Sequence, residues 1–183
     1  METEALAQLL RKLRFTADFP DLMLKQLAAA ATIRRFVPHA VLFWEKSEND
    51  QLMIICSGSV SLDIQVPGHG SVQLLTLGPG ELLAWSALLG GRMTTTATAV
   101  EETKIVSISS AQVLAACEAD HSFGYWLMRR LSDSLAGRLT ETRTQLVDIL
   151  TFDQAIGIRA TNTAPVRVKV PGNPAPGHSR PHS

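Results

Sequence analysis

The sequence predicts a β-barrel-like roll flanked by helices, mainly β in content, with a long helix on its C-terminal side. Helical periodicity opens the chain, short strands separated by turn residues follow, and helical periodicity returns after Ile108. Strands this short and this evenly punctuated favour a sandwich or barrel over a βαβ sheet. We therefore divide the chain into N-terminal helices (1–31), a β-roll (32–109), a short and a long helix (110–150) and a flexible tail (151–183).

Two short helices are expected before the roll. Residues 3–14 carry leucines and alanines at helical spacing with a polar opposite face. The stretch Asp18-Phe19-Pro20-Asp21 then offers a capping residue and an early proline, which are typical of a second helix start.

Turn residues divide the middle of the chain into seven candidate strands. Residues 60–66 alternate strictly between apolar and polar, which indicates a sheet with one buried face. Ser57-Gly58, Pro67-Gly68 and Gly78-Pro79-Gly80 are turn signals. The predicted strands cover residues 32–37, 41–44, 51–56, 59–66, 72–77, 93–100 and 104–108.

Residues 81–92 interrupt the strands. The segment is apolar, poor in β-branched residues and closed by Gly90 and Gly91, so we expect a strand end, a single helical turn and a Gly-Gly-Arg loop.

After the roll, Ser110 can cap a short helix, and Asp120 or Ser122 can cap a long one that runs to about Leu150. The long helix carries a narrow apolar seam that needs a second surface to cover it. If the same helix of a second copy covers the seam, the protein is a homodimer. The alternative is that the seam packs on its own domain. The seam residues are Leu127, Leu131, Leu135, Leu139 and Leu146. The tail that follows is rich in proline and glycine, a composition that cannot bury enough surface to fold.

Composition excludes several classes of function. Lys+Arg and Asp+Glu are equal at 17 each, so no global basic field favours nucleic acid or a membrane surface. No run of about eighteen apolar residues could span a membrane, and the start METEALAQLL lacks the features of a signal peptide. Cys56 and Cys117 have no metal spacing. We therefore expect a cytoplasmic protein with reduced cysteines.

No catalytic or metal motif is found. The five histidines include no close His-x-His pair with a carboxylate, and no serine-hydrolase elbow or His-Glu-x-x-His is present. We expect no enzymatic activity, no metal and no certain cofactor.

The order of these elements, with their turns, resembles the cyclic nucleotide-binding domain family, in particular the sensor domain of catabolite-activator and fumarate-nitrate-regulator type transcription factors. The resemblance covers about residues 12–150 and implies a jelly-roll-like double-stranded β-helix with a long dimerisation helix. The segments that carry it are Phe19-Pro20-Asp21, Val41-Leu42-Phe43, residues 53–60, residues 77–82 and the Ala-Thr-Ala run at 97–99.

The family's phosphate-binding segment departs from its pattern here. In relatives a glutamate accepts from the ribose hydroxyl and an arginine pairs with the cyclic phosphate, a charge-assisted contact. This chain has Trp85 at the glutamate position and Met93 at the arginine position, with Arg92 one place earlier. An indole offers only an N–H donor and a thioether carries no charge, so the resemblance does not extend to ordinary cAMP or cGMP. His39 and Lys46 replace two loop glycines of the family.

The candidate ligand pocket takes its residues from this segment and from one position on the long helix. Trp85 is either a stacking platform or a plug in an unused pocket, and Arg92 is either an anion contact or a solvated charge. The resemblance also points to Thr142, near where some relatives contact the base. The candidates are Leu83, Trp85, Ser86, Gly90, Gly91, Arg92, Met93, Thr94, Thr95 and Thr142.

Three functions follow as hypotheses. The first is a dimeric sensor for a small anionic or nucleotide-like effector that acts on an unknown downstream protein. The second is a transcription regulator that lacks, or has lost, its helix-turn-helix; the Pro-rich residues 151–183 cannot hold a winged helix, so direct DNA binding is not expected. The third is a ligand-free interaction module with Trp85 filling its pocket.

Overall fold

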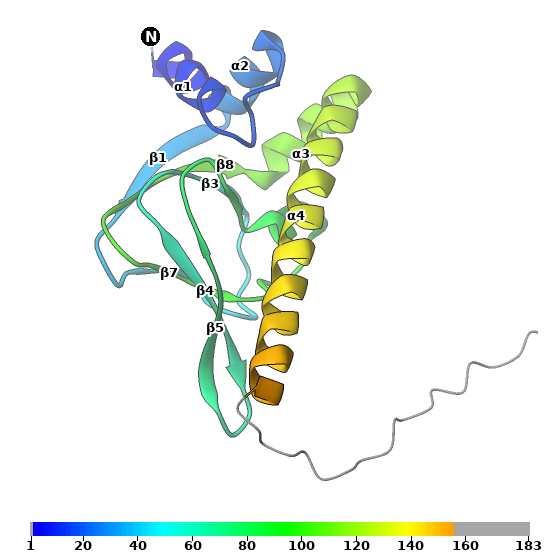
Figure 1. Ribbon diagram of the computed structural model, residues 1–183. Coiled ribbons are helices and arrows are strands. Elements are labelled where there is room, and N and C mark those ends of the chain that lie inside the picture. The colour runs from blue at the N-terminus through cyan, green and yellow to red at the C-terminus, as the bar shows by residue number, and fades with distance from the viewer. Residues whose placement is uncertain (1, 156–183) are drawn as a thin grey trace, which may run out of the picture. The chain divides into compact units, whose positions relative to one another are not determined.

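The turn residues of the middle segment do separate short strands. The computed structural model, which describes residues 2–155, arranges eight of them in two antiparallel four-stranded sheets (Figure 1). One sheet has the order β1-β8-β3-β6 and the other β2-β7-β4-β5. The strands are β1 (Ala31–Phe36), β2 (Val41–Phe43), β3 (Gln51–Ser57), β4 (Val60–Val66), β5 (Gly70–Leu77), β6 (Leu82–Leu83), β7 (Thr96–Ala99) and β8 (Thr103–Ser109).

Helices flank the strands as expected, and the predicted jelly-roll-like fold is confirmed. Between β6 and β7 lies the 3-10 turn η1 (Trp85–Leu89), where a single helical turn was predicted. The helices are α1 (Glu2–Arg11), α2 (Asp21–Ala29), α3 (Ser110–Ala119) and α4 (His121–Ala155). The chain divides into one unit that ends at Leu146 and another that begins at Val147; the roll and the sites below belong to the first.

The inner strands β3 and β8 of the first sheet are buried on both faces. Leu52 and Ile54 of β3 face the helices, while Met53 and Ile55 face the other sheet, because successive strand residues point in opposite directions. A strand covered on both faces reads as a continuous apolar run, which is how residues 52–55 appear in the sequence.

The second sheet has one covered face. Val60 and Leu62 of β4 are buried against the first sheet, and Ser61 and Asp63 between and after them are only half-buried. The strict alternation of residues 60–66 therefore predicted the right kind of sheet. The pairing of β4 with β5 shifts register between Leu62 and Asp63.

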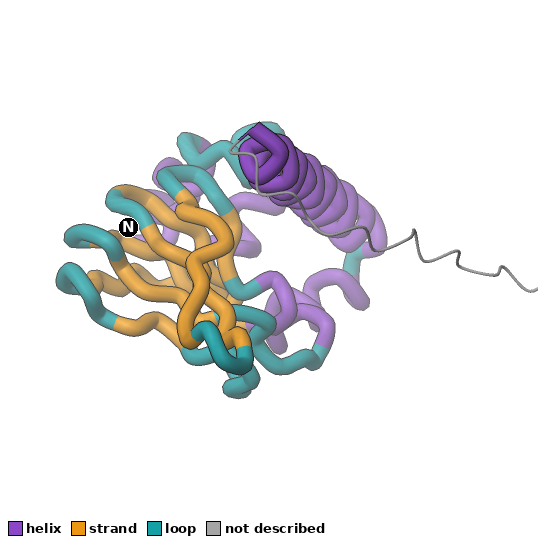
Figure 2. Tube along the Cα trace, turned by 60° about the horizontal axis from the view of Figure 1, so that its bottom comes forward, coloured by secondary structure: helices purple, strands orange, loops and turns teal. Residues whose placement is uncertain are grey.

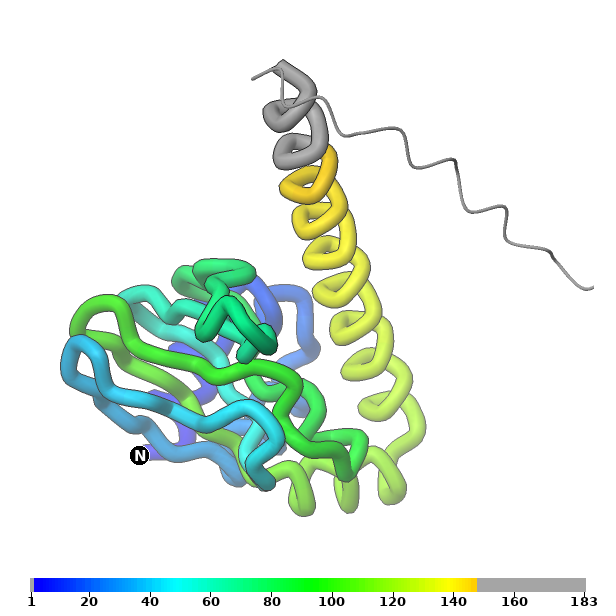
Figure 3. The backbone as a smooth tube through the Cα atoms, turned by 90° about the horizontal axis from the view of Figure 1, so that it is seen from below, coloured from blue at the N-terminus to red at the C-terminus, as the bar shows by residue number. Residues whose placement is uncertain are grey.

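A second core lies between the helices and the first sheet. Leu10 of α1, Phe19, and Phe123 and Leu127 of α4 are almost fully buried in it. Figure 2 shows the strands gathered on one side and the helices on the other, and Figure 3 shows the part of α4 up to Leu146 running along one side of the roll.

Helix α4 is fixed at its start and near its middle. The Asp120 carboxylate accepts hydrogen bonds from the backbone N–H groups of Ser122 (2.9 Å) and Phe123 (3.3 Å), which makes it the cap. Arg130 donates through Nε to the Phe15 carbonyl at 3.1 Å and through Nη2 to the Arg14 carbonyl, and its Nη1 lies 3.5 Å from Asp18. These contacts attach α4 to the loop between α1 and α2.

The boundaries differ from prediction in three places. The strand expected over 93–100 begins only at Thr96, although Met93 still exchanges backbone hydrogen bonds with the loop at Lys46 and Ser47. Residues 82–83 form a short separate strand, β6. Helix α4 continues past Leu150 to Ala155, so residues 151–155 are helical and not part of a tail; the remainder of the predicted tail, residues 156–183, lies outside the described residues.

Candidate functional site

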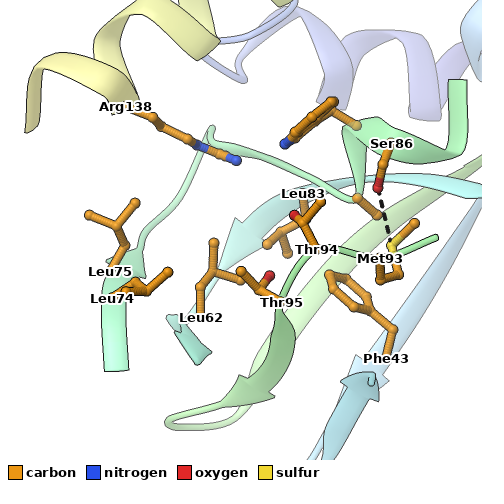
Figure 4. A pocket seen from close by; sticks show the side chains of 12 residues that line it. Phe43, Leu62, Leu74, Leu75, Leu83, Ser86, Met93, Thr94, Thr95 and Arg138 are labelled. Carbon is orange, nitrogen blue, oxygen red and sulfur yellow. Dashed lines mark hydrogen bonds between the residues drawn. The ribbon is translucent and has the colours of Figure 1, made fainter. Parts of the chain in front are cut away.

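A cavity of about 130 Å³ opens between the two sheets, next to η1 and α4 (Figure 4). Its walls are mostly apolar, with the hydroxyls of Ser86, Thr94 and Thr95 and one charged side chain, Arg138, as the polar groups. The lining residues are Phe43, Leu62, Leu74, Leu75, Leu83, Ala84, Trp85, Ser86, Met93, Thr94, Thr95 and Arg138.

Met93 belongs to the wall of this cavity and to the core beneath it. The residue is 2% exposed, and its sulfur accepts from the Ser86 hydroxyl at 3.6 Å and lies 3.8 Å from Asn49 Nδ2. Figure 4 shows the Ser86–Met93 contact. A buried thioether held in this way supplies no positive charge where the family's arginine would stand.

Trp85 forms a wall of the cavity. It begins η1 directly after Ala84, whose φ of 53° turns the chain sharply out of β6. The half-buried indole packs against the helix-side core and lines the cavity, which remains open beside it. This arrangement favours Trp85 as a stacking platform for a ligand over Trp85 as a plug that fills the cavity.

Four of the ten predicted pocket residues do not line the cavity. Gly90, Gly91 and Arg92 are exposed and line a different hollow, together with Glu48, Asn49, Asp50 and Ser110. The loop therefore directs Arg92 away from the ligand cavity. Thr142 is exposed on α4 and is not a lining residue. The other six (Leu83, Trp85, Ser86, Met93, Thr94 and Thr95) do come together there.

Sequence reasoning missed the cation of the site, Arg138. A signal was available, because the buried α4 residues Phe123, Leu127 and Leu131 follow steps of four, and a further step of seven reaches Arg138. An arginine on the buried side of an amphipathic helix is unusual enough to suggest a role. Phe43, Leu62, Leu74, Leu75 and Ala84 were also missed, since strand pairing brings them in from distant segments.

The guanidinium of Arg138 is incompletely paired. Its Nη2 donates to the Leu82 carbonyl, while its Nε is buried without a hydrogen-bond partner. Burial lowers the pKa of Arg138, and the charges of Glu81 and Glu141 oppose this effect. Among residues 2–147, whose side chains the structure describes, no carboxylate forms an ion pair with it. The group remains cationic, because an arginine does not lose its proton in proteins.

Glu81, the acid whose charge acts most strongly on Arg138, stabilises a turn. One carboxylate oxygen accepts from the Gly78 N–H at 2.7 Å, and the other lies 2.8 Å from Arg14 Nη2. It joins Arg138 in lining a separate, charged groove along α4 rather than the apolar cavity.

The predicted dimer seam divides between two environments. Leu127 and Leu131 lie in the core of their own domain, and Leu135 packs partly against it. Leu139 is 72% exposed and Leu146 56% exposed. Two apolar residues that the sequence analysis did not include, Tyr125 and Met128, are also exposed on α4.

The two cysteines are free and half-buried, and burial raises the pKa of each thiol. Among residues 2–155, no group of three His, Cys, Asp or Glu side chains could hold a metal ion. None of the helices in the same part of the chain combines the length and apolarity that crossing a bilayer requires.

Comparison with known proteins agrees with this architecture. Residues 33–120 match the family model described as cyclic nucleotide-binding domain. These residues therefore form a domain of the cyclic nucleotide-binding family, as the sequence motifs predicted. A search of the curated proteins finds no match.

Solved structures extend the likeness beyond the matched segment. A cyclic nucleotide-binding domain from Methylobacillus flagellatus KT superposes with a TM-score of 0.69 at 18% identity, over 80% of this chain and 83% of that one. A putative cyclic nucleotide-binding protein from Geobacter metallireducens GS-15 gives 0.64 at 26% identity, over 76% and 98%. The catabolite activator protein of Thermus thermophilus gives 0.61 at 25% identity, over 78% of this chain and 65% of that one.

Proposed function

We propose that this chain is a non-catalytic regulatory sensor whose cavity binds a small effector other than cAMP or cGMP. The observation that carries the proposal is the chemistry of the cavity wall. Met93 stands where relatives have their phosphate-binding arginine, and among the described lining residues there is no carboxylate to accept from a ribose hydroxyl.

The size of the cavity supports the same conclusion. A volume of about 130 Å³ is close to that of protein cavities that accommodate a single benzene ring. A cyclic nucleotide has a purine, a ribose and a phosphate to place, which is far more than one ring.

A bound effector can act on α4 through contacts already present. Arg138 of α4 lines the cavity and donates to the carbonyl of Leu82, next to the lining residue Leu83. Arg130, two turns earlier on the same helix, holds the loop after α1. An effector that prefers one position of Arg138 would shift the populations of α4 positions, provided its affinities for them differ.

The second part of the proposal is a homodimer formed through α4. A set of apolar residues on α4, exposed except for the half-buried Leu135, follows steps of three, seven, four and seven, which place them on one narrow face of the helix. We infer that the seam consists of Tyr125, Met128, Leu135, Leu139 and Leu146. Leu127 and Leu131 are excluded, since their own core covers them.

We further propose that the signal passes to another protein in the cytoplasm and not directly to DNA. The chain carries 17 basic and 17 acidic residues and therefore lacks the excess of positive charge that dominates binding to phosphate backbones.

Isothermal titration calorimetry with cAMP and cGMP tests the ligand assignment. We expect no binding of either nucleotide at concentrations up to about millimolar, where contacts worth only about 4 kcal/mol would still be detected. Binding of cAMP at micromolar or lower concentrations would show that Met93 and Trp85 do not prevent recognition, and would overturn the proposal.

A further inference from the structure

Arg138 is the only charged group among the described residues that line the cavity. It comes from α4, whereas the other lining residues come from the strands and from η1 and its flanking turns. Figure 4 shows its side chain extending from the helix over the cavity, opposite Phe43 and Met93. A single cation above an apolar cavity is suited to a ligand with one negative charge and an apolar body.

The guanidinium has unused hydrogen-bonding capacity. Among the described residues, its buried Nε has no partner, and its one hydrogen bond is donated by Nη2 to the Leu82 carbonyl. A buried donor without an acceptor is unfavourable, so an acceptor supplied by a ligand would improve this arrangement. Nε and Nη2 lie on the same edge of the guanidinium, which matches the two oxygens of a carboxylate.

The neighbouring acids do not fill this role. Glu81 contacts the Gly78 N–H and Arg14, and neither it nor Glu141 forms an ion pair with Arg138. The groove along α4, which Arg138 also borders, carries equal numbers of basic and acidic side chains: Arg14, Arg130, Arg138, Glu81, Asp133 and Glu141. Among the described residues, none of these acids forms an ion pair with Arg138, so its guanidinium remains available to a ligand carboxylate.

The apolar part of the ligand follows from the cavity. Phe43, Leu62 and Leu83 line it, and its volume of about 130 Å³ corresponds to one six-membered ring. The hydroxyls of Ser86, Thr94 and Thr95 can accept or donate one or two further hydrogen bonds to ring substituents.

We propose that the cavity binds a small organic monocarboxylate with a body of about one ring, and that Arg138 is the residue that binds its carboxylate. This inference rests on the proposed sensor function and names its ligand class. It places the positive charge of the site on α4. In relatives this charge comes from an arginine of the roll, at the position that Met93 occupies here.

Calorimetry with benzoate as the probe tests the proposal, with benzamide as the neutral analogue of the same shape. The full chain is compared with Arg138→Gln and with Arg92→Gln, which removes the arginine of the exposed loop. We expect Arg138→Gln to weaken benzoate binding about ten- to a hundredfold, because it removes a charge-assisted contact. Benzamide affinity should be the same in the full chain and in Arg138→Gln, which also shows that the variant has kept its cavity. Arg92→Gln should bind benzoate as the full chain does.

The outcomes separate this inference from the proposed function. Absence of benzoate binding, or equal benzoate affinity in Arg138→Gln and the full chain, overturns the inference. The same holds if Arg92→Gln is the variant that loses binding. Each of these results leaves the sensor proposal intact so long as cAMP and cGMP do not bind. Tight cAMP binding in the parallel titration overturns the proposed ligand selectivity itself.

Discussion

Two residues of the roll have backbone conformations that glycine adopts more easily. His39 has φ of 66° and Lys46 has φ of 65°, both in the left-handed region, and both side chains are exposed. Backbone hydrogen bonds hold them there: His39 N–H donates to the Ala99 carbonyl at 2.8 Å and Lys46 N–H to the Met93 carbonyl at 2.7 Å. These are the positions where the family resemblance predicted loop glycines.

His39→Gly should therefore stabilise the protein. Relief of the left-handed strain gains about 1–2 kcal/mol, and the greater freedom of glycine in the unfolded chain costs about 0.5–1 kcal/mol. The net effect is an increase of about 0.5–1 kcal/mol in the free energy of unfolding, measured by urea denaturation. Glu48→Gly is the control: its φ is not positive, so it should lose stability. A loss for His39→Gly of the size seen for Glu48→Gly would contradict this explanation.

At the residue scale, the sequence predicted the chemical character of the candidate site better than the positions of its residues. The replacement of an arginine by Met93 could be recognised from its place after the Gly90-Gly91 loop, because local motifs keep their spacing. Arg138 was missed although its helix was predicted, since only the packing of α4 on the roll decides which helix residues reach the cavity. Arg92, which the sequence left as either an anion contact or a solvated charge, is exposed in a hollow outside the cavity, and only the path of its loop decides this.

Among the turns, Gly78-Pro79-Gly80 carries the most structural constraint. Gly80 has φ of 82°, and a Cβ there would lie 2.8 Å from the backbone nitrogen of Arg14. Its carbonyl accepts from the Phe15 N–H at 3.1 Å, and its N–H donates to the Ile55 carbonyl at 2.8 Å. The turn thus brings β3 and the loop after α1 together.

Gly80→Ala should destabilise the protein by about 2–5 kcal/mol, because positive φ costs about 1–2 kcal/mol and overpacking about 1–3 kcal/mol. Gly78→Ala, in the same turn, is the matched control. A Cβ at Gly78 meets only a carboxylate oxygen of Glu81 at 3.9 Å, so this change should leave the melting temperature nearly unaltered. Equal melting temperatures for the two variants would show that the close approach to Arg14 is not real.

At the scale of elements, periodicity and turn residues were sufficient to predict most of the fold. The strict alternation of residues 60–66 corresponds to a strand with one buried face, and the apolar run 52–55 to a strand buried on both faces. The strand end expected at the start of residues 81–92 corresponds to β6. Its partner could not be anticipated, because Leu82 and Leu83 pair with a distant strand, β3.

For the whole molecule, the exposed face of α4 is the surface on which the proposed dimer depends. Leu127 and Leu131 were predicted to lie in the same seam as Leu139 and Leu146, since a steady leucine spacing does not show which turns have a core beside them. The fold separates them, and leaves the second pair available to a partner.

Leu139→Lys should reduce the molecular mass measured by sedimentation equilibrium from that of a dimer to that of a monomer, because a charge at the centre of the seam would be buried unpaired. Thr144→Lys is the control, since Thr144 is exposed and lies on another side of α4. A monomeric full chain at micromolar concentration, or a dimer that persists in Leu139→Lys, would contradict the proposed seam.

The sheet shared by the two cores has a mechanical consequence. Since Met53 and Ile55 support one core while Leu52 and Ile54 of the same strand support the other, β3 cannot leave its place without disrupting both cores. The roll and the helices that cover it should consequently unfold together in one cooperative transition. A change that strains the cavity should therefore also destabilise the helices.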